Sequence, residues 1–176
     1  MEYPGLSDEE IVAFFRRISA LMSQAEPPPA PAHAAPSQNP PGRMILHTDG
    51  GSRGNPGLAG FGVVLLDAQG NTAAEKGVCL ARATCNEAEY QGLIAGLELA
   101  QEHGVRDLLV RSDSQLLVRQ LNGEYKVKSP RLLSFFLRAR KLLEGFPAWK
   151  AEHIPRERNA RADELANEAM DRGMNG

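Results

Sequence analysis

The succession of residue patterns from Met44 onward constrains the fold more strongly than any other feature of the sequence. Three segments with the composition of strands come first, and glycine-containing turns separate them: MILHTD, FGVVLLD and the stretch 73–80. Helical patterns then alternate with two further strand patterns, DLLVRSD and AWKAEHI, of which the first is apolar enough for a buried central position. The predicted order is β-β-β-α-β-α-α-β-α, which indicates an α/β domain.

The chain divides into three predicted parts. Residues 1–26 contain SDEEIVAFFRRISALMSQ, in which apolar residues recur at helical spacing, so we predict an amphipathic helix as an N-terminal extension. Residues 27–43 are rich in proline and form a predicted extended linker. Residues 44–173 form the predicted main domain. Because one helix cannot bury its apolar stripe alone, the N-terminal helix must dock on the main domain, associate with a second copy or bind a partner protein.

Composition and charge exclude several classes of protein. The net charge is −2, so no global basic field indicates nucleic acid, and any such partner must bind at a local site. The two cysteines, Cys79 and Cys85, are too few for a disulfide framework or a zinc cluster. No apolar run reaches the ~18 residues of a membrane span, and the N-terminus lacks the features of a signal peptide. We therefore expect a cytoplasmic protein without membrane contact.

Four carboxylates stand at positions that an α/β fold brings together. Asp49 ends the first strand and Asp113 ends the central one, whereas Glu89 and Asp163 lie in the first turns of helices. Strand ends and helix starts of such a sheet converge on one edge, where sites are commonly found. Carboxylates that lie close together repel one another unless cations neutralise them. Hard divalent cations take oxygen ligands, and a pair of them can promote phosphodiester hydrolysis.

Each acid also has a purely structural explanation. Asp49 precedes two glycines and could be a turn residue, and Glu89 could close a capping box that starts at Asn86. Asp113 could cap the helix that follows it, and Asp163 could be a favourable charge in a first helical turn. Residue chemistry alone therefore leaves both the metal site and the structural explanations open.

Four segments of the chain resemble the sequence blocks of the ribonuclease H type 1 family, in the family's order: TDGGSRGNPGLAGFG, TCNEAEYQGLIAGL, RSDSQLLVRQLNGEYKVKSPRL and HIPRERNARADELAN. The resemblance spans residues 44–172. It is nearest to the compact bacterial and archaeal reverse-transcriptase-like branch, because no long basic handle loop separates Asp113 from Asp163. It implies a ribonuclease H-like fold, in which helices flank a five-stranded mixed sheet of three antiparallel strands followed by two parallel ones.

The resemblance also implies an activity. The expected enzyme is an endonuclease that hydrolyses the RNA strand of RNA–DNA hybrids and leaves 5′-phosphate and 3′-hydroxyl ends. The expected cofactor is a pair of Mg²⁺ ions, for which Mn²⁺ can substitute. The expected partner is the RNA–DNA hybrid, and a protein distinguishes RNA from DNA through the 2′-hydroxyl and the groove width.

Individual residues are assigned by the same resemblance. The implied metal ligands and catalytic residues are Asp49, Glu89, Asp113 and Asp163. Glu87 competes with Glu89, and we choose Glu89 because it follows Thr84 by five residues, as in the family, and shares a helical stripe with small and apolar residues. The implied substrate contacts are Gly50, Asn55, Thr84, Asn86 and Gln115.

A further catalytic residue is left between two candidates. His153 lies ten residues before Asp163, an interval at which the family often has a mobile histidine that assists proton transfer or product release. His153 also alternates with Trp149 on a predicted strand, so it could instead be a packed structural residue. Arg156 is the alternative, because an arginine can serve instead in the compact branch.

Basic residues give a local footprint for nucleic acid. Lys126, Lys128 and Arg131 in EYKVKSPR could contact DNA-strand phosphates or form a solvated loop.

Two other functions share the fold, namely a module that binds hybrids or RNA without cutting and another nuclease of the superfamily. The first would lack one of the four acids, and all four are present. Exonucleases of the second kind typically begin with Asp-x-Glu, whereas this strand ends in Asp-Gly-Gly.

Overall fold

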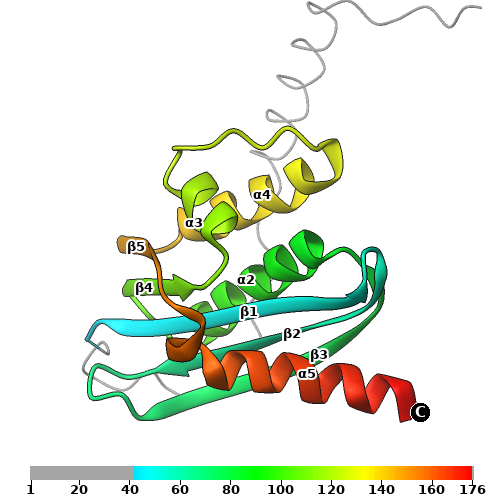
Figure 1. The fold of residues 1–176 in the computed structure, drawn as a ribbon. Helices are drawn as coiled ribbons and strands as arrows, with labels where there is room; N and C mark the ends of the chain where they lie inside the picture. Colours follow the sequence, from blue (N-terminus) through cyan, green and yellow to red (C-terminus); the bar gives the residue numbers. More distant parts are fainter. Residues whose placement is uncertain (1–41, 176) are drawn as a thin grey trace, which may run out of the picture. The chain divides into compact units, whose positions relative to one another are not determined.

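Five strands form one mixed sheet in the computed structural model of the protein, which describes residues 42–175 (Figure 1). The strands are β1 (Met44–Gly54), β2 (Gly57–Leu66), β3 (Thr72–Ala83), β4 (Asp107–Ser112) and β5 (Ala148–His153). β1, β2 and β3 are antiparallel neighbours, β4 is parallel to β1, and β5 is parallel to β4. The strand order is β3-β2-β1-β4-β5, so the predicted sheet of three antiparallel strands followed by two parallel ones is confirmed.

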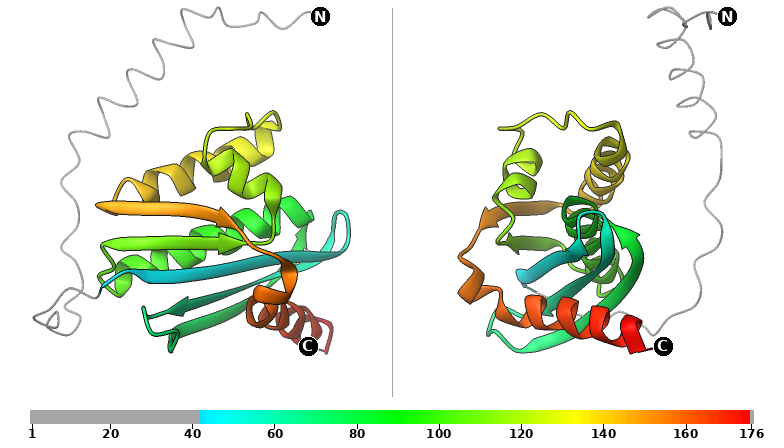
Figure 2. Two further views of the ribbon diagram at one scale, coloured as in Figure 1. Left: turned by 60° about the vertical axis from the view of Figure 1, so that its left-hand side comes forward. Right: turned by 45° about the vertical axis from the view of Figure 1, so that its right-hand side comes forward.

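Helices cover both faces of this sheet (Figures 1 and 2). One face carries α2 (Cys85–Glu102), α3 (Gln115–Leu121) and α4 (Pro130–Leu143). The other face carries α5 (Ala160–Asn175), which packs against β1, β2 and β3. The short 3-10 helix η1 (Arg156–Arg158) joins β5 to α5. The order of these elements is the predicted one.

Two of the three predicted parts of the chain fall largely outside this description. The helix predicted within residues 1–26 and residues 27–41 of the predicted linker lie outside the described residues. The predicted main domain, residues 44–173, lies entirely within them.

Alternation along the strands divides the apolar side chains between the two faces. Phe61, Val63 and Leu65 of β2 belong to the larger core beneath α2, whereas Val64 packs with Leu165 of α5. Other fully buried members of the larger core are Leu46, Leu93, Leu97, Leu108, Val110 and Leu117. Each large side chain removed from water stabilises the fold by roughly 1.5–3 kcal/mol. The central strands β1 and β4, which carry Asp49 and lead into Asp113, both contribute to this core.

Glycines in β2 and β3 let α5 lie close to the sheet. A Cβ atom at Gly62 would lie 2.1 Å from the carbonyl oxygen of Ala162, and one at Gly77 would lie 2.7 Å from that of Leu165. Any side chain at these positions would push α5 away from the sheet. The close packing fixes the first turn of α5, which carries Asp163, against the strands.

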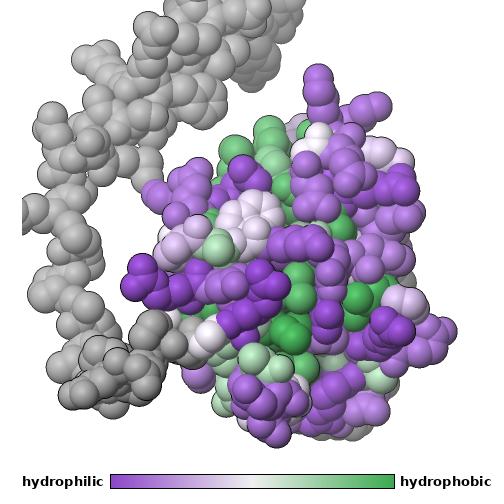
Figure 3. All heavy atoms as spheres, turned by 90° about the vertical axis from the view of Figure 1, so that its left-hand side faces the viewer, coloured by the Kyte–Doolittle hydropathy of each residue, from purple (hydrophilic) through white to green (hydrophobic). Residues whose placement is uncertain are grey.

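Hydrophilic residues dominate the face of the molecule drawn in Figure 3, with hydrophobic side chains in smaller groups between them. Leu116 and Tyr125, two of the exposed apolar residues, line a cavity together with Lys126 and Lys128, so this part of the surface combines apolar and basic side chains. Within the described range, no helix has both the length and the hydropathy needed to cross a membrane.

Candidate active site

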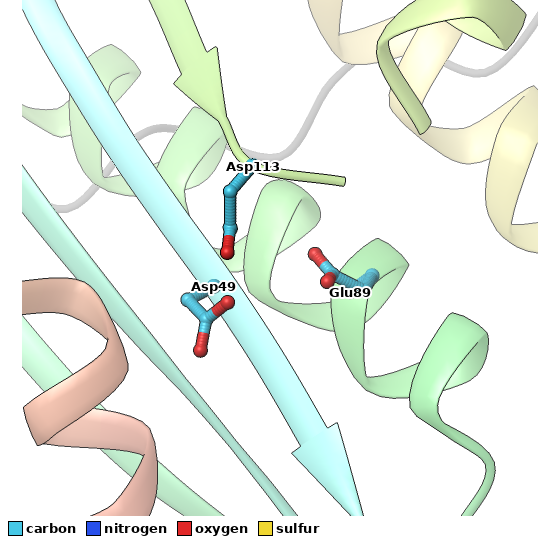
Figure 4. Close-up of side chains that lie close together, drawn as sticks. All are labelled: Asp49, Glu89 and Asp113. Atoms are coloured by element: carbon cyan, nitrogen blue, oxygen red, sulfur yellow. The ribbon is translucent and has the colours of Figure 1, made fainter. Parts of the chain in front are cut away.

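Three of the four predicted acids meet at one edge of the sheet. Asp49 comes from β1, Glu89 from α2 and Asp113 from the residue after β4, and their side chains face a common space (Figure 4). One carboxylate oxygen from each acid lies within 4.8 Å of one from each of the others. Groups at this separation can hold a single cation between them.

Strand pairing brings Asp49 and Asp113 to the same level. β1 and β4 are parallel, and their register pairs Leu46 with Val110 and His47 with Arg111. β1 does not end at Asp49 as predicted, because residues 50–54 continue its pairing with β2. The register of β1 and β4, continued by two residues, sets Asp49 beside Asp113 at the carboxyl edge of β4. This edge is where open α/β sheets commonly place their sites.

A glycine brings Glu89 to the same place. A Cβ atom at Gly50 would lie 2.3 Å from the backbone nitrogen of Glu89 and 2.4 Å from the carbonyl carbon of Ala88. Only glycine therefore lets the start of α2 lie against β1 at the residue that follows Asp49. Gly50 was predicted as a substrate contact, and in the structure it also sets the distance between two of the acids.

The buried carboxylates carry strongly raised pKa values. Burial, followed by the charges of Asp113 and Asp163, raises the pKa of Asp49 to about 7. Burial and the charges of Asp49 and Asp113 raise the pKa of Glu89 well above its ordinary value. The Oε2 atom of Glu89 is buried and has no hydrogen-bond partner among the described residues. Carboxylates that repel one another, one of them with an unpaired oxygen, fit a hard divalent cation, which offsets both costs.

Asp163 faces the same cavity but has other partners. The cavity, of about 320 Å³, is lined by all four acids and by Arg156 of η1. A guanidinium nitrogen of Arg156 donates to Asp163 Oδ1, and Asn167 Nδ2 donates to Asp163 Oδ2 over 3.2 Å. The structure therefore brings the fourth acid to the cavity, while its carboxylate is bonded to a cationic side chain.

The structural explanations for two of the acids do not hold. The capping box at the start of α2 begins at Thr84 and closes with Glu87, so neither Asn86 nor Glu89 is part of it. The cap of α3 is Ser114, whose hydroxyl accepts a hydrogen bond from the Leu117 amide. Glu89 and Asp113 are thus free of the helix-capping roles considered for them.

Three of the predicted substrate contacts line a second cavity. Asn55, Thr84 and Asn86 surround it together with Glu87 and Arg131. The Oδ1 atom of Asn55 accepts a hydrogen bond of 3.3 Å from the Cys85 amide, which ties the β1–β2 turn to the start of α2. The fifth predicted contact, Gln115, is exposed at the start of α3 and lines neither this cavity nor the acidic one.

His153 and Arg156, the two candidate helpers, both lie near the acids. His153 ends β5 and is exposed, with Nε2 3.2 Å from the carbonyl oxygen of Asp113, so the interpretation as a packed structural histidine is wrong. Arg156 lines the acidic cavity directly, and its charge acts on Asp49, Asp113 and Asp163.

Sequence reasoning missed Asn159 beside the acids, and it did not anticipate the partner of Arg131. Asn159 is buried and donates from Nδ2 to Asp113 Oδ1 over 2.8 Å, although 46 residues separate them. Arg131 pairs with Glu87 over 3.0 Å. The Thr-x-x-Glu spacing of Thr84 and Glu87 is a visible capping-box pattern that could have separated Glu87 from Glu89. No local signal marks the long-range contact of Asn159.

The sheet order, together with acids within β1, at the end of β4 and at the start of α2, defines a nuclease of the ribonuclease H-like fold. A family model described as "Reverse transcriptase-like" matches residues 47–169. "Ribonuclease HI" of Halobacterium salinarum is 43% identical over 169 residues, which cover 96% of this chain and 83% of that protein. This chain belongs to the ribonuclease H type 1 family.

Solved structures agree with this assignment. The crystal structure of RNase H1 from the archaeon Halobacterium salinarum is 49% identical with a TM-score of 0.72, and the match covers 74% of this chain and 98% of that one. LC11-RNase H1, solved in complex with an RNA/DNA hybrid, is 46% identical with a TM-score of 0.72, covering 74% of this chain and 99% of that one. Both cover nearly all of the solved chain, so the whole catalytic fold is shared.

Proposed function

We propose that this protein is an endonuclease that hydrolyses the RNA strand of RNA–DNA hybrids and leaves 5′-phosphate and 3′-hydroxyl ends. The observation that carries the proposal is the meeting of Asp49, Glu89 and Asp113 in a chain 43% identical to a ribonuclease HI. The hybrid bound to LC11-RNase H1, 46% identical to this chain, supports the choice of substrate.

The metal-dependent chemistry of the family assigns a role to the four acids. Asp49, Glu89, Asp113 and Asp163 would hold two Mg²⁺ ions, or Mn²⁺ in their place. When bound, two such ions supply an activated water and stabilise the charge on the attacking and leaving oxygens. Because Asp163 is bonded to Arg156, a cation at Asp163 competes with the guanidinium for the same carboxylate.

The second cavity is suited to a phosphate of the hybrid backbone. Asn55, Thr84 and Asn86 offer polar side chains, and Arg131 contributes a positive charge beside them. Glu87 makes the cavity partly acidic, so the Arg131 guanidinium is needed to offset its charge. Gly50 and Gln115 are the other proposed contacts, Gly50 in the acidic cavity and Gln115 at the exposed start of α3.

A basic surface extends the proposed path of the hybrid. Lys126 and Lys128 line a cavity with Tyr125 and Leu116. The guanidinium of Arg119 lies 5.0 Å from the centre of the Tyr125 ring, which holds the ring in place. Such lysines attract nucleic-acid phosphates irrespective of sequence. This local footprint reconciles nucleic-acid binding with the net charge of −2.

The helper role at the cut site, in proton transfer or product release, is assigned to His153 or Arg156. Arg156 is already in the acidic cavity, whereas His153 lies beside the Asp113 backbone at the exposed end of β5.

The proposed role of residues 1–26 is a contact with a partner protein or with a second copy of the chain. The alignment with the Halobacterium protein covers 96% of this chain and so extends into the residues before 42.

The test is cleavage of an end-labelled RNA–DNA hybrid by the full chain, beside duplex RNA, duplex DNA and single-stranded RNA. We expect internal cuts in the RNA strand of the hybrid alone, in Mg²⁺ or Mn²⁺ but not in chelator, with 5′-phosphate and 3′-hydroxyl ends. Cleavage that persists in chelator, or hybrid binding with no cleavage under any of these conditions, would contradict the proposal.

A further inference from the structure

Asn159 makes hydrogen bonds at or beside three of the four acids. Its side chain is 1% exposed, and it immediately precedes α5. Its Nδ2 atom donates to the carbonyl oxygen of Thr48 over 3.0 Å and to Asp113 Oδ1 over 2.8 Å. Its own carbonyl oxygen accepts from the Asp163 amide over 3.1 Å. One residue thus touches the backbone beside Asp49, the carboxylate of Asp113 and the backbone of Asp163.

The Asn159 side chain does not do what asparagine usually does before a helix. An asparagine in this position normally turns its Oδ1 atom toward the amides of the first helical turn. Here Oδ1 is buried and has no hydrogen-bond partner among residues 42–175. A buried polar atom left unpaired costs stability. Asn159 therefore makes no capping bond and leaves its Oδ1 atom unpaired, whereas its Nδ2 atom donates to Asp113.

The orientation of the amide is fixed by its partners. Both groups that contact Nδ2 are oxygens that can only accept, namely a backbone carbonyl and a carboxylate. The amide group must therefore present its nitrogen to them. The bond occupies one oxygen of Asp113 and restrains the carboxylate, and the other oxygen stays available to face Asp49 and Glu89.

We propose that Asn159 is a positioning residue, which holds the Asp113 carboxylate in its cation-binding orientation and sets α5 in register with β1. The proposal rests on the proposed function, because it assigns the four acids to a divalent cation. Polar groups that orient a metal ligand typically contribute 10–100-fold to metal affinity. Loss of the Asn159 amide should therefore weaken cation binding by about 10-fold or more, even without nucleic acid.

The experiment is a calorimetric titration of the full chain with Mn²⁺ alone. Asn159→Ala removes the donor, and Asn159→Ser removes it while keeping a side chain that can cap α5. The matched control is Asn122→Ala, because Asn122 Nδ2 also donates to a backbone carbonyl, that of Ala151, without contacting an acid. Thermal unfolding of all four proteins in chelator accompanies the titrations and measures stability separately from cation binding.

We expect both Asn159 variants to bind Mn²⁺ at least about 10-fold more weakly than the wild type, and Asn122→Ala to bind it as the wild type does. If Asn159→Ala fails to fold, Asn159→Ser decides the question. Wild-type affinity in the Asn159 variants, or an equal loss in Asn122→Ala, would overturn this inference alone. A wild-type chain that binds no Mn²⁺ would overturn the proposed function and this inference together.

Discussion

Glu87 and Glu89 stand two residues apart in the first turns of α2, and their charged and hydrogen-bonding partners differ. Glu87 accepts hydrogen bonds from the Thr84 amide and hydroxyl and pairs with Arg131, and the bond from the Thr84 amide is the largest cause of its lowered pKa. Glu89 faces Asp49 and Asp113, has an unpaired buried oxygen and has a raised pKa. Glu87 stabilises the fold, whereas Glu89 is kept in the fold at a cost in stability.

The difference shows how a function can be recognised from energetics. A carboxylate that serves the fold collects donors and a cation, because these compensate for its burial. A carboxylate that serves a ligand is left with fewer of them, and the ligand must supply the remaining compensation. Glu89 meets the second description, and Glu87 meets the first.

The largest expected effect contrasts these two residues in catalysis. Glu89→Gln should lower turnover on the hybrid by at least about 10²–10³-fold, because it removes a charged ligand from the reacting centre. Glu87→Gln should keep most of the turnover, because Glu87 touches no other acid. Single-turnover cleavage by the two variants side by side measures the difference. Equal losses of turnover in the two variants would contradict the distinction between Glu87 and Glu89.

The second effect separates the two candidate helpers. Arg156→Ala should lower turnover by about 10-fold, at or below the low end of general acid–base contributions, and should lower it more than His153→Ala does. The reason is that Arg156 lines the acidic cavity, whereas His153 lies at its margin beside a backbone carbonyl. Turnover measured against pH for both variants checks the order. A larger loss in His153→Ala would reverse the assignment.

The third effect concerns stability. Glu87→Gln should lower the free energy of unfolding by about 1–2 kcal/mol, because it weakens the capping box and removes the pairing with Arg131. Glu89→Gln should leave that free energy unchanged or raise it in chelator, because it relieves carboxylate repulsion. Urea unfolding of both variants without metal gives the two values. A stability loss confined to Glu89→Gln would contradict the contrast.

The smallest effect is expected from removing residues 1–41. The four acids and the two cavities beside them are built from residues 49–170, so the shortened chain should fold and cleave hybrid within about threefold of the full chain. Any self-association of the full chain should disappear. Activity and sedimentation of the two chains test this. A folded but inactive shortened chain would mean that the removed residues help to build the site.

Much of the fold could be predicted from the sequence, because alternation and turn residues are local signals. The five strands, the order of the helices and the end of β4 follow from such patterns, and Asp49 and Asp113 are found with them. The end of β1 was predicted wrongly, because the glycine-rich residues after Asp49 continue the strand to Gly54. Glu89 required the resemblance, since Glu87 is an equally plausible acid by position. The Thr84–Glu87 capping box explains why only one of the two glutamates was available to the site.

The remaining features depend on contacts between distant parts of the chain. Asn159 reaches Thr48 across 111 residues, and Arg131 reaches Glu87 from a different helix. The pairing of Arg156 with Asp163 is closer in sequence, but it depends on how η1 turns the chain into α5. Patterns in a single sequence carry no record of such distances, so these contacts appear only in the structure.

The most direct test of the acid cluster is the stability of the wild-type chain against pH, with and without Mg²⁺. The folded pKa of Asp49 is about 7, above its ordinary value of 3.8. The folded protein thus holds protons that the unfolded chain has released, so the free energy of unfolding should fall as pH rises between about 4 and 7. Mg²⁺ should restore stability near pH 7 and have little effect near pH 4, where Asp49 and Glu89 are protonated. Stability in chelator that does not fall across this window, and that Mg²⁺ does not change, would contradict the account.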